Sequence, residues 1–158
     1  MQAELTQTDI RILQLLQENA ALSTADIAEQ VGLSQSPCWR RISRLEEAGL
    51  IRKRVAVLDH ARLGMEVIVF VNISLSAHGR QDLSAFEVEI EKFPEVLECY
   101  TVTGQMDYLL KIVTRDIQHY ESFIRDKLMT LPTIREMHST IAITEIKNTT
   151  ELPLLTQL

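Results

Sequence analysis

Residues 23–51 read STADIAEQVGLSQSPCWRRISRLEEAGLI, and this stretch decides the fold of the N-terminal part of the chain. Its pattern predicts two short helices joined by a tight turn. In the first helix, Ile27, Ala28 and Val31 share one apolar side. Gly32 ends this helix, because a chain leaves a helix most easily through a residue in the left-handed conformation.

The second helix of this stretch carries a buried stripe and a basic outer surface. Ser34 is a suitable N-cap, and Pro37 falls in the first turn, where its missing N–H costs little. Cys38, Ile42 and Leu45 recur at helical spacing and form the stripe. The side chains expected to face solvent are Ser36, Trp39, Arg40, Ser43 and Arg44. A short helix, a glycine turn and a capped helix with outward arginines are typical of the helix-turn-helix that enters the major groove of DNA.

The charge distribution supports this interpretation. A net charge of −6 argues against a nucleic-acid-binding coat over the whole surface. Residues 1–62, however, carry eight basic and eight acidic side chains, so the whole acidic excess lies in residues 63–158. Residues 35–54 carry six basic side chains against two acidic ones. A focused basic patch of this kind is typical of a surface that contacts DNA phosphates.

The candidate DNA-contacting residues lie in the turn, on the second helix and in the basic run after it. We expect Arg40 and Arg44 to contact bases or phosphates. The basic run is expected to contact phosphates or stabilise a wing rather than to read bases. Trp39 packs on a neighbouring helix or strand or lies against the DNA backbone, and Arg41 packs its stem or pairs with an acidic neighbour. The full candidate set is Ser34, Gln35, Ser36, Pro37, Trp39, Arg40, Ser43, Arg44, Arg52, Lys53 and Arg54.

The sequence predicts one further helix before this stretch and a wing after it. Residues 8–18 read as a helix with Thr8 as its N-cap. Residues 52–58, RKRVAVL, are basic and apolar in turn, which suits a strand or an extended wing. We therefore expect a headpiece over residues 1–58, a linker over 59–65 and a second domain over 66–158.

The second part of the chain alternates strands and helices. Expected strands cover 66–75, 97–102, 108–113 and 134–146, and expected helices cover 81–93 and 116–131. The order β-α-β-β-α-β predicts a ferredoxin-like domain, so the fold class of the whole chain is α+β, with a winged helix-turn-helix domain first. Two helices on one face of a four-stranded sheet leave the other face uncovered, which predicts self-association.

Several classes of protein do not fit the sequence. The longest apolar run, Val67–Val71, is too short to span a bilayer, and the N-terminus has no signal-peptide pattern. Cys38 and Cys99 fall in different expected domains, so we expect no disulfide framework and a cytoplasmic location. The four histidines lack ligand spacing, and no phosphate-binding glycine loop or activated nucleophile is recognisable. We therefore expect no metal, no cofactor and no enzymatic activity, although the ferredoxin-like architecture also hosts enzymes.

The chain resembles the leucine-responsive/asparagine-regulator (Lrp/AsnC) family of prokaryotic transcription factors over nearly its whole length. The motifs that carry the resemblance are DIRILQLLQENA (9–20), VGLSQSPCWRRISRLEEAGLI (31–51) and PEVLECYTVTGQMDYLL (94–110). The resemblance implies a regulator that binds operator DNA as a homodimer, formed through the sheet of the second domain, or as an octamer of four dimers. It also implies an amino acid or similar small effector, bound between dimers.

The resemblance places the effector at the loop between the second and third strands of this domain. Gly104 permits a turn that exposes N–H groups to a carboxylate, and Asp107 can pair with an α-ammonium group. The same two residues also suit a plain hairpin turn without a ligand. Met106 and Tyr108 are candidates for a side-chain subsite. The candidate effector residues are Tyr100, Thr101, Val102, Gly104, Gln105, Met106, Asp107, Tyr108 and, by analogy alone, Thr140.

An alternative function stays open at this point. The chain could be an oligomeric ligand- or partner-binding module without specific DNA binding. The basic patch over residues 35–54 argues against this alternative, because such a module does not need a focused positive surface.

Overall fold

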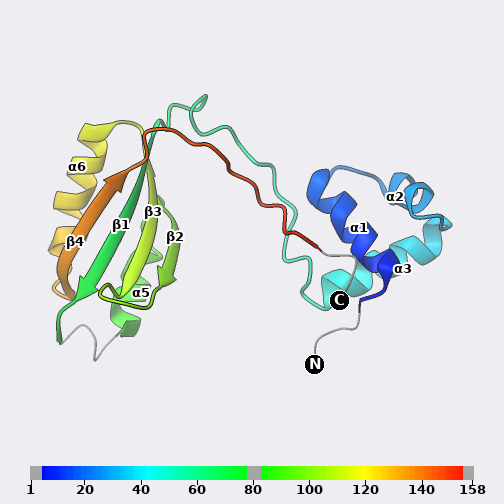
Figure 1. Ribbon diagram of the computed structural model, residues 1–158, viewed down its shortest axis with the longest axis horizontal. Coiled ribbons are helices and arrows are strands. Elements are labelled where there is room, and N and C mark those ends of the chain that lie inside the picture. Colours follow the sequence, from blue (N-terminus) through cyan, green and yellow to red (C-terminus); the bar gives the residue numbers. More distant parts are fainter. Residues whose placement is uncertain (1–4, 78–82, 155–158) are drawn as a thin grey trace. The chain divides into compact units, whose positions relative to one another are not determined.

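The chain forms two compact units in the computed structural model, which describes residues 5–77 and 83–154 (Figure 1). One unit contains the N-terminal residues to Val57 together with the C-terminal segment from Lys147, and the other contains Leu58–Ile146. Three predicted segments extend beyond the described residues. They are the headpiece at its start, the second domain at its end and the helix expected over 81–93 at its start.

The N-terminal unit is a three-helix headpiece. Its helices are α1 (Gln7–Glu18), α2 (Thr24–Gln30) and α3 (Gln35–Glu47). The predicted glycine turn between α2 and α3 is confirmed, since Gly32 has a φ of 69°. The stripe predicted on α3 is also confirmed, because Cys38, Ile42 and Leu45 are buried in one core with residues of α1 and α2. Burial of one apolar side chain contributes about 1.5–3 kcal/mol, so packing stabilises helices that are too short to persist alone.

α1 begins earlier than predicted because its N-cap is Thr6 and not Thr8. The Thr6 hydroxyl accepts from the Asp9 N–H, and the Asp9 carboxylate accepts from the Thr6 N–H. This reciprocal pair is a capping box, and Thr8 could not form it because its own third successor is an arginine. Ser23 and Asp26 form the same arrangement at the start of α2.

The C-terminal segment packs on α1 of the headpiece. The side-chain amide of Gln17 donates to the Leu152 carbonyl oxygen at 3.2 Å and accepts from the Leu152 N–H at 2.7 Å. The amide of Gln14 donates to the Leu154 carbonyl oxygen, and the Leu154 side chain packs against the headpiece core. The second domain was expected to run to residue 158, and this boundary stays a prediction. In the structure, residues 147–154 group with the headpiece, where Leu154 packs against the apolar core.

The expected wing is extended but is not a strand. Residues 52–58 have no regular secondary structure, and a strand requires a hydrogen-bonded neighbour, which this segment lacks among the described residues. Val55 and Val57 are 58% and 78% exposed. The expected linker over 59–65 contains a turn, in which the Met65 N–H donates to the His60 carbonyl oxygen at 2.8 Å.

The second unit is a four-stranded antiparallel sheet with helices on one face (Figure 1). Its elements are β1 (Val67–Leu75), α5 (Leu83–Ile90), β2 (Val96–Thr101), β3 (Tyr108–Thr114), α6 (Ile117–Asp126), the 3-10 helix η1 (Leu128–Thr130) and β4 (Ile134–Ile141). The strand order β2-β3-β1-β4 confirms the predicted ferredoxin-like arrangement. β4 ends at Ile141, earlier than predicted, because β1 begins at Val67, only two residues beyond Val69, the partner of Ile141. The Ala142 N–H still donates to the Ile68 carbonyl oxygen at 2.9 Å, but residues 144–146 would lie past the start of β1.

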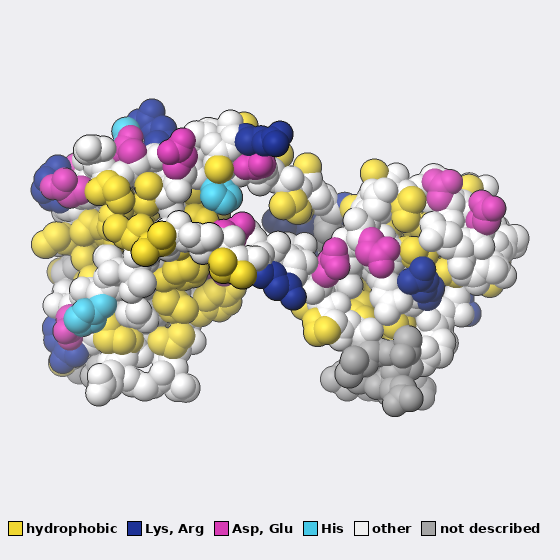
Figure 2. Space-filling view, turned by 45° about the horizontal axis from the view of Figure 1, so that its top comes forward, with side chains coloured by type: hydrophobic (Ala, Val, Ile, Leu, Met, Phe, Trp, Pro, Cys, Tyr) yellow, Lys and Arg dark blue, Asp and Glu magenta, His cyan; other side chains and the backbone are white. Residues whose placement is uncertain are grey.

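Alternation along the strands separates the core of this unit from an open sheet face. Val71 of β1 packs in one core with Phe86 of α5 and Phe123 of α6. Phe70, which precedes Val71 in β1, points to the opposite face of the sheet and is 38% exposed. Thr140 of β4 pairs with Phe70 and shares that face, and Figure 2 shows hydrophobic side chains gathered on this unit. The uncovered face predicted from the sequence is therefore present in the single chain, while self-association through it stays a prediction.

Candidate functional site

The outer surface of α3 presents Trp39 and Arg40 to solvent. Ser34 is the N-cap of α3 as predicted, although its side chain makes no capping hydrogen bond. Trp39 is 59% exposed, which disfavours the interpretation that its ring packs on a neighbouring helix or strand. Arg40 is exposed as well, and no ion pair joins it to another residue of the described chain. Both side chains are thus accessible to a partner.

A buried carboxylate holds the other two arginines of α3. The Asp9 side chain is fully buried, and its oxygens accept from Arg41 at 2.9 Å and from Arg44 at 2.8 Å. Arg41 therefore pairs with an acidic neighbour, which is one of its two predicted roles. Arg44, expected to contact DNA, has an internal partner too, although its side chain is 58% exposed. Asp9 thus fixes the start of α1 to α3 and keeps both guanidinium groups at one surface.

Two opposed effects determine the pKa of Asp9. Burial, the larger single effect, raises the pKa of this carboxyl group. The hydrogen bonds from Thr6 and Arg41 and the positive charge of Arg44 together outweigh burial and hold the pKa below its usual value. Asp9 is therefore charged at neutral pH. Three arginines against one buried carboxylate leave the part of α3 up to Arg44 positive.

The arginines of α3 surround one depression. Pro37, Arg40, Arg41 and Arg44 line a cavity of about 300 Å³. A guanidinium group is planar and always charged, and its donors match the oxygens of a phosphate group. Positive walls also raise the local concentration of an anion. These arginines can therefore bind a phosphate group of DNA. Arg40 would then lie near the polar edges of the neighbouring bases.

The basic run after α3, residues 52–54, contains one arginine with an internal partner and two exposed basic side chains. Arg54 pairs with Glu46 at 2.8 Å, and both side chains are more than a third exposed. Such an exposed pair contributes about 0–1 kcal/mol, so it adds little to the stability of the fold. Arg52 and Lys53 are exposed. Arg54 therefore has an internal partner, and the phosphate contacts expected of this run stay a prediction.

Gly104 and Asp107 build the turn between β2 and β3. Gly104 has a φ of 114°, a conformation that is open to glycine and strained for other residues. One Asp107 oxygen accepts from the Leu75 N–H at 2.7 Å, and the Asp107 N–H donates to the Ile73 carbonyl oxygen at 2.8 Å. Asp107 therefore anchors the turn to the end of β1, as the hairpin interpretation predicts. Thr103, Gly104 and Gln105 remain exposed at the tip.

The other effector candidates do not all meet at this turn in the single chain. Tyr108 is 2% exposed, its ring lies 4.6 Å from that of Phe86, and its hydroxyl donates to Glu87 at 2.8 Å. Burial and the hydrogen bond to Glu87 raise the pKa of Tyr108 to about 12. Tyr108 is a candidate for a side-chain subsite, and in the single chain its side chain lies in the core because strand alternation turns it inward. Tyr100 and Thr140 lie on β2 and β4, the two opposite edges of the sheet.

Sequence reasoning missed Asp9. Its local signal was available, since Thr6 and Asp9 have the spacing of a capping box. The contacts with Arg41 and Arg44 join residues more than thirty positions apart, and only the fold brings them together. Within the described ranges, no group of histidine, cysteine and acidic side chains is arranged to hold a metal ion. No helix in those ranges combines the length and hydrophobicity needed to cross a membrane.

Two protein-family models match the chain. The model described as winged helix-turn-helix DNA-binding matches residues 5–52, and the model described as Lrp/AsnC ligand binding domain matches residues 68–152. The first range covers the three helices of the headpiece, and the second begins within β1. The two models therefore match the helices of the headpiece and the sheet of the second unit.

Related proteins with known names are regulators of transcription. Transcriptional regulator AzlB of Bacillus subtilis is 41% identical over 150 residues, which cover 95% of this chain and 96% of that protein. The DNA-binding transcriptional activator DecR of Escherichia coli is 33% identical and covers 95% of this chain and 99% of its own. The crystal structure of a transcriptional regulator of Neisseria meningitidis in complex with L-Met has a TM-score of 0.91 and 38% identity, and covers 98% of this chain and 100% of that one. An AsnC family regulator from Agrobacterium tumefaciens has the same TM-score and coverage, with 44% identity.

Proposed function

The chain belongs to the Lrp/AsnC family of DNA-binding transcriptional regulators, and on that premise we propose that it binds operator DNA through α3 and responds to an amino acid bound by its second unit. The observation that carries the proposal is the surface of α3, where Trp39 and Arg40 are exposed beside the two arginines held by Asp9. The proposed role is regulatory rather than catalytic. A regulator of operator DNA acts in the cytoplasm.

The proposed DNA contacts divide along α3. Arg40 has no internal partner in the described chain and reaches base edges or a phosphate, while Trp39 lies against the DNA backbone. Arg41 and Arg44 offer their remaining N–H donors to phosphates, and Asp9 restricts their rotamers before DNA arrives. In a two-fold dimer, two such helices meet half-sites separated by about one helical turn, or by a multiple of it.

The proposed assembly uses the open face of the sheet. Phe70 and Thr140 lie on that face, and pairing it with a second copy of the chain would remove exposed apolar surface from water. The family resemblance extends this dimer to an octamer of four dimers. The L-Met complex of the Neisseria relative supports an amino-acid effector for this chain too. We place that effector at the exposed turn around Gly104, where backbone N–H groups can meet a carboxylate.

A matched pair of variants tests the DNA contacts. Operators are first selected from a random duplex library with the wild-type protein. Arg40→Ala should then weaken binding to the selected operator by about fivefold or more, because a lost base contact costs about 1–3 kcal/mol. Arg11→Ala removes the same charge from the exposed surface of α1 and should change the affinity by less than about twofold. Equal losses in the two variants would refute the assignment of α3 as the reading helix.

A thermal-shift screen of the twenty amino acids tests the effector. A ligand that binds only the folded protein raises the transition temperature. Asp107→Asn keeps an oxygen for the Leu75 N–H but removes the charge expected to meet an α-ammonium group, so it should abolish the shift with little loss of basal stability. Glu121→Gln, an exposed charge change on α6, is the control and should retain the shift. No shift with any amino acid would refute the effector part and leave DNA binding intact.

A further inference from the structure

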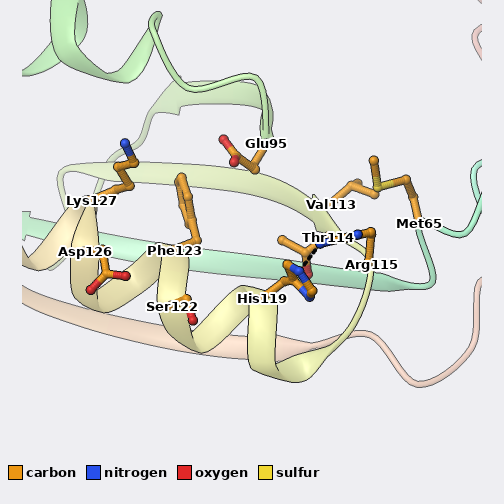
Figure 3. Close-up of a pocket in the computed structure, with 10 residues that line it drawn as sticks. All are labelled: Met65, Glu95, Val113, Thr114, Arg115, His119, Ser122, Phe123, Asp126 and Lys127. Carbon is orange, nitrogen blue, oxygen red and sulfur yellow. Dashed lines mark hydrogen bonds between the residues drawn. The ribbon is translucent and has the colours of Figure 1, made fainter.

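A second cavity lies in the sheet unit, at the end of β3 opposite the turn of Gly104. It measures about 340 Å³, and its lining comes from β3, α6 and the residues just before β1 and β2 (Figure 3). Tyr108 begins β3 beside the turn, whereas Val113 at the far end of this seven-residue strand lines the cavity. Since a strand rises about 3.3 Å per residue, the cavity lies roughly 20 Å from the turn. The two places are therefore separate sites.

The inner side of this cavity is apolar. Val113 and Phe123 are 8% and 5% exposed, and both line the cavity. The Phe123 ring is fixed by edge-on contact with Phe93, with ring centres 5.5 Å apart and planes at 90°. Met65 adds a flexible thioether at the other end, 41% exposed (Figure 3). A preformed apolar surface of this kind favours the side chain of a small ligand.

Two charges of opposite sign lie at the rim and have no side-chain partner among the described residues. The Glu95 carboxylate and the Lys127 ammonium form no ion pair or hydrogen bond with another side chain of the described residues, and they flank the Phe123 ring in Figure 3. The other charged groups of the lining are engaged. Asp126 contacts Arg125 at 3.4 Å, and His119 contacts both Asp116 and Arg115. The cavity therefore offers one accessible anion, one accessible cation and an apolar surface between them.

We propose that this cavity binds an α-amino acid with an apolar side chain, at a site separate from the turn of Gly104. Glu95 accepts from the α-ammonium group, Lys127 donates to the carboxylate, and the ligand side chain lies on Phe123 and Val113 toward Met65. The cavity volume falls at the lower end of the range for small-molecule sites, which suits a ligand of this size. Charge-assisted contacts at both ends favour a zwitterion over ligands that carry only one of the two charges.

Methyl NMR can observe the two sites separately. The chain contains five methionines, of which Met65 lines the cavity and Met106 lies in the turn between β2 and β3. Full-length protein labelled at the methionine methyl carbons is titrated with leucine, isoleucine, valine or phenylalanine to about 10 mM, a range that covers millimolar dissociation constants. The signals are assigned with Met65→Leu and Met106→Leu. We expect at least one of these amino acids to shift the Met65 signal with saturation.

Two variants and two analogues identify the contacts. Glu95→Gln and Lys127→Ala should each weaken the Met65 response by about tenfold, the loss of one charge-assisted hydrogen bond. The N-acetyl derivative of the amino acid, which lacks the ammonium charge, should bind about tenfold more weakly to the wild type but show no further loss in Glu95→Gln. The methyl ester, which lacks the carboxylate charge, should likewise bind about tenfold more weakly to the wild type but show no further loss in Lys127→Ala. Glu121→Gln, on the same helix but outside the cavity, is the matched control and should leave the response unchanged.

The results separate this site from the effector turn. A Met65 signal that stays constant with all four amino acids overturns the proposal, and so does a response that survives both rim variants. A response of Met106 without one of Met65 would overturn the second site and leave the proposed effector turn intact. The opposite pattern would establish the cavity and refute the turn.

Discussion

Replacing Asp9 with alanine should lower the free energy of unfolding of the headpiece by about 2–3 kcal/mol. The buried carboxylate accepts from the N–H and hydroxyl groups of Thr6 and from the guanidinium groups of Arg41 and Arg44. Loss of the capping box accounts for about 1 kcal/mol. Each arginine contact adds about 0.5–1 kcal/mol, a reduced value because Arg41 and Arg44 are 32% and 58% exposed and solvent screens their charges.

Asp26→Ala is the matched control for this prediction. Asp26 forms the same capping box with Ser23 at the start of α2, but it is exposed and forms no ion pair with a described arginine. Its removal should therefore cost less than the removal of Asp9. Asp9→Asn should fall between the two, because asparagine keeps an acceptor for the Thr6 N–H and loses the charge.

Urea denaturation of the full-length protein measures these differences. Trp39 is the only tryptophan of the chain and lies on α3, so its fluorescence reports the headpiece and not the sheet unit. The linear extrapolation gives the free energy of unfolding for each variant. If Asp9→Ala costs no more than Asp26→Ala, the arginine contacts contribute nothing and the reasoning is refuted.

Three further predictions follow from contacts in the two units. Folding lowers the pKa of Asp9, so its contribution to stability is fully present above the unfolded value of about 4 and is lost as the pH falls through the folded pKa. Asp9→Asn should therefore flatten the pH dependence of the urea midpoint below about pH 5, and an unchanged slope there would contradict this. Leu154→Ala should lower the free energy of unfolding of the headpiece by about 1 kcal/mol, because a half-buried leucine side chain is removed from its core. Urea denaturation followed by Trp39 fluorescence measures this loss, and an unchanged free energy would show that the C-terminal segment adds no stability. Tyr108→Phe keeps the ring but removes the hydrogen bond to Glu87, so it should lower the free energy of unfolding by about 1 kcal/mol. In an absorbance titration, the variant should also lack the tyrosine with a pKa of about 12.

The sequence predicts the fold wherever the determining pattern is local. The stripe of Cys38, Ile42 and Leu45 and the glycine turn at Gly32 are set by residues a few positions apart, and both are confirmed. The boundaries of helices and strands depend on contacts with residues far apart in the sequence. β4 ends near the start of β1, which leaves residues 144–146 without a partner strand, and no property of those residues reveals this. Leu154 joins the headpiece core from the other end of the chain.

The candidate site shows the same division. Helical periodicity correctly turned Arg40 and Arg44 outward, but it could not show that Arg44 meets a buried carboxylate on another helix. Tyr108 is a candidate for a side-chain subsite because it lies in the loop that the family resemblance indicates for the effector. Its strand register against Ile73 places the ring in the core instead. Glu95 and Lys127 lack any motif, since only the fold brings them to one cavity.

Operator affinity with and without the effector tests the central claim most directly. The claim joins a DNA-binding headpiece and an amino-acid-binding unit in one regulator. Fluorescence anisotropy of a selected operator should show an affinity change of about 5–150-fold on saturation with the amino acid found by thermal shift, which corresponds to a coupling of about 1–3 kcal/mol. Asp107→Asn should remove this change without altering the affinity measured in the absence of the amino acid. An operator affinity that stays the same with every amino acid would contradict the account.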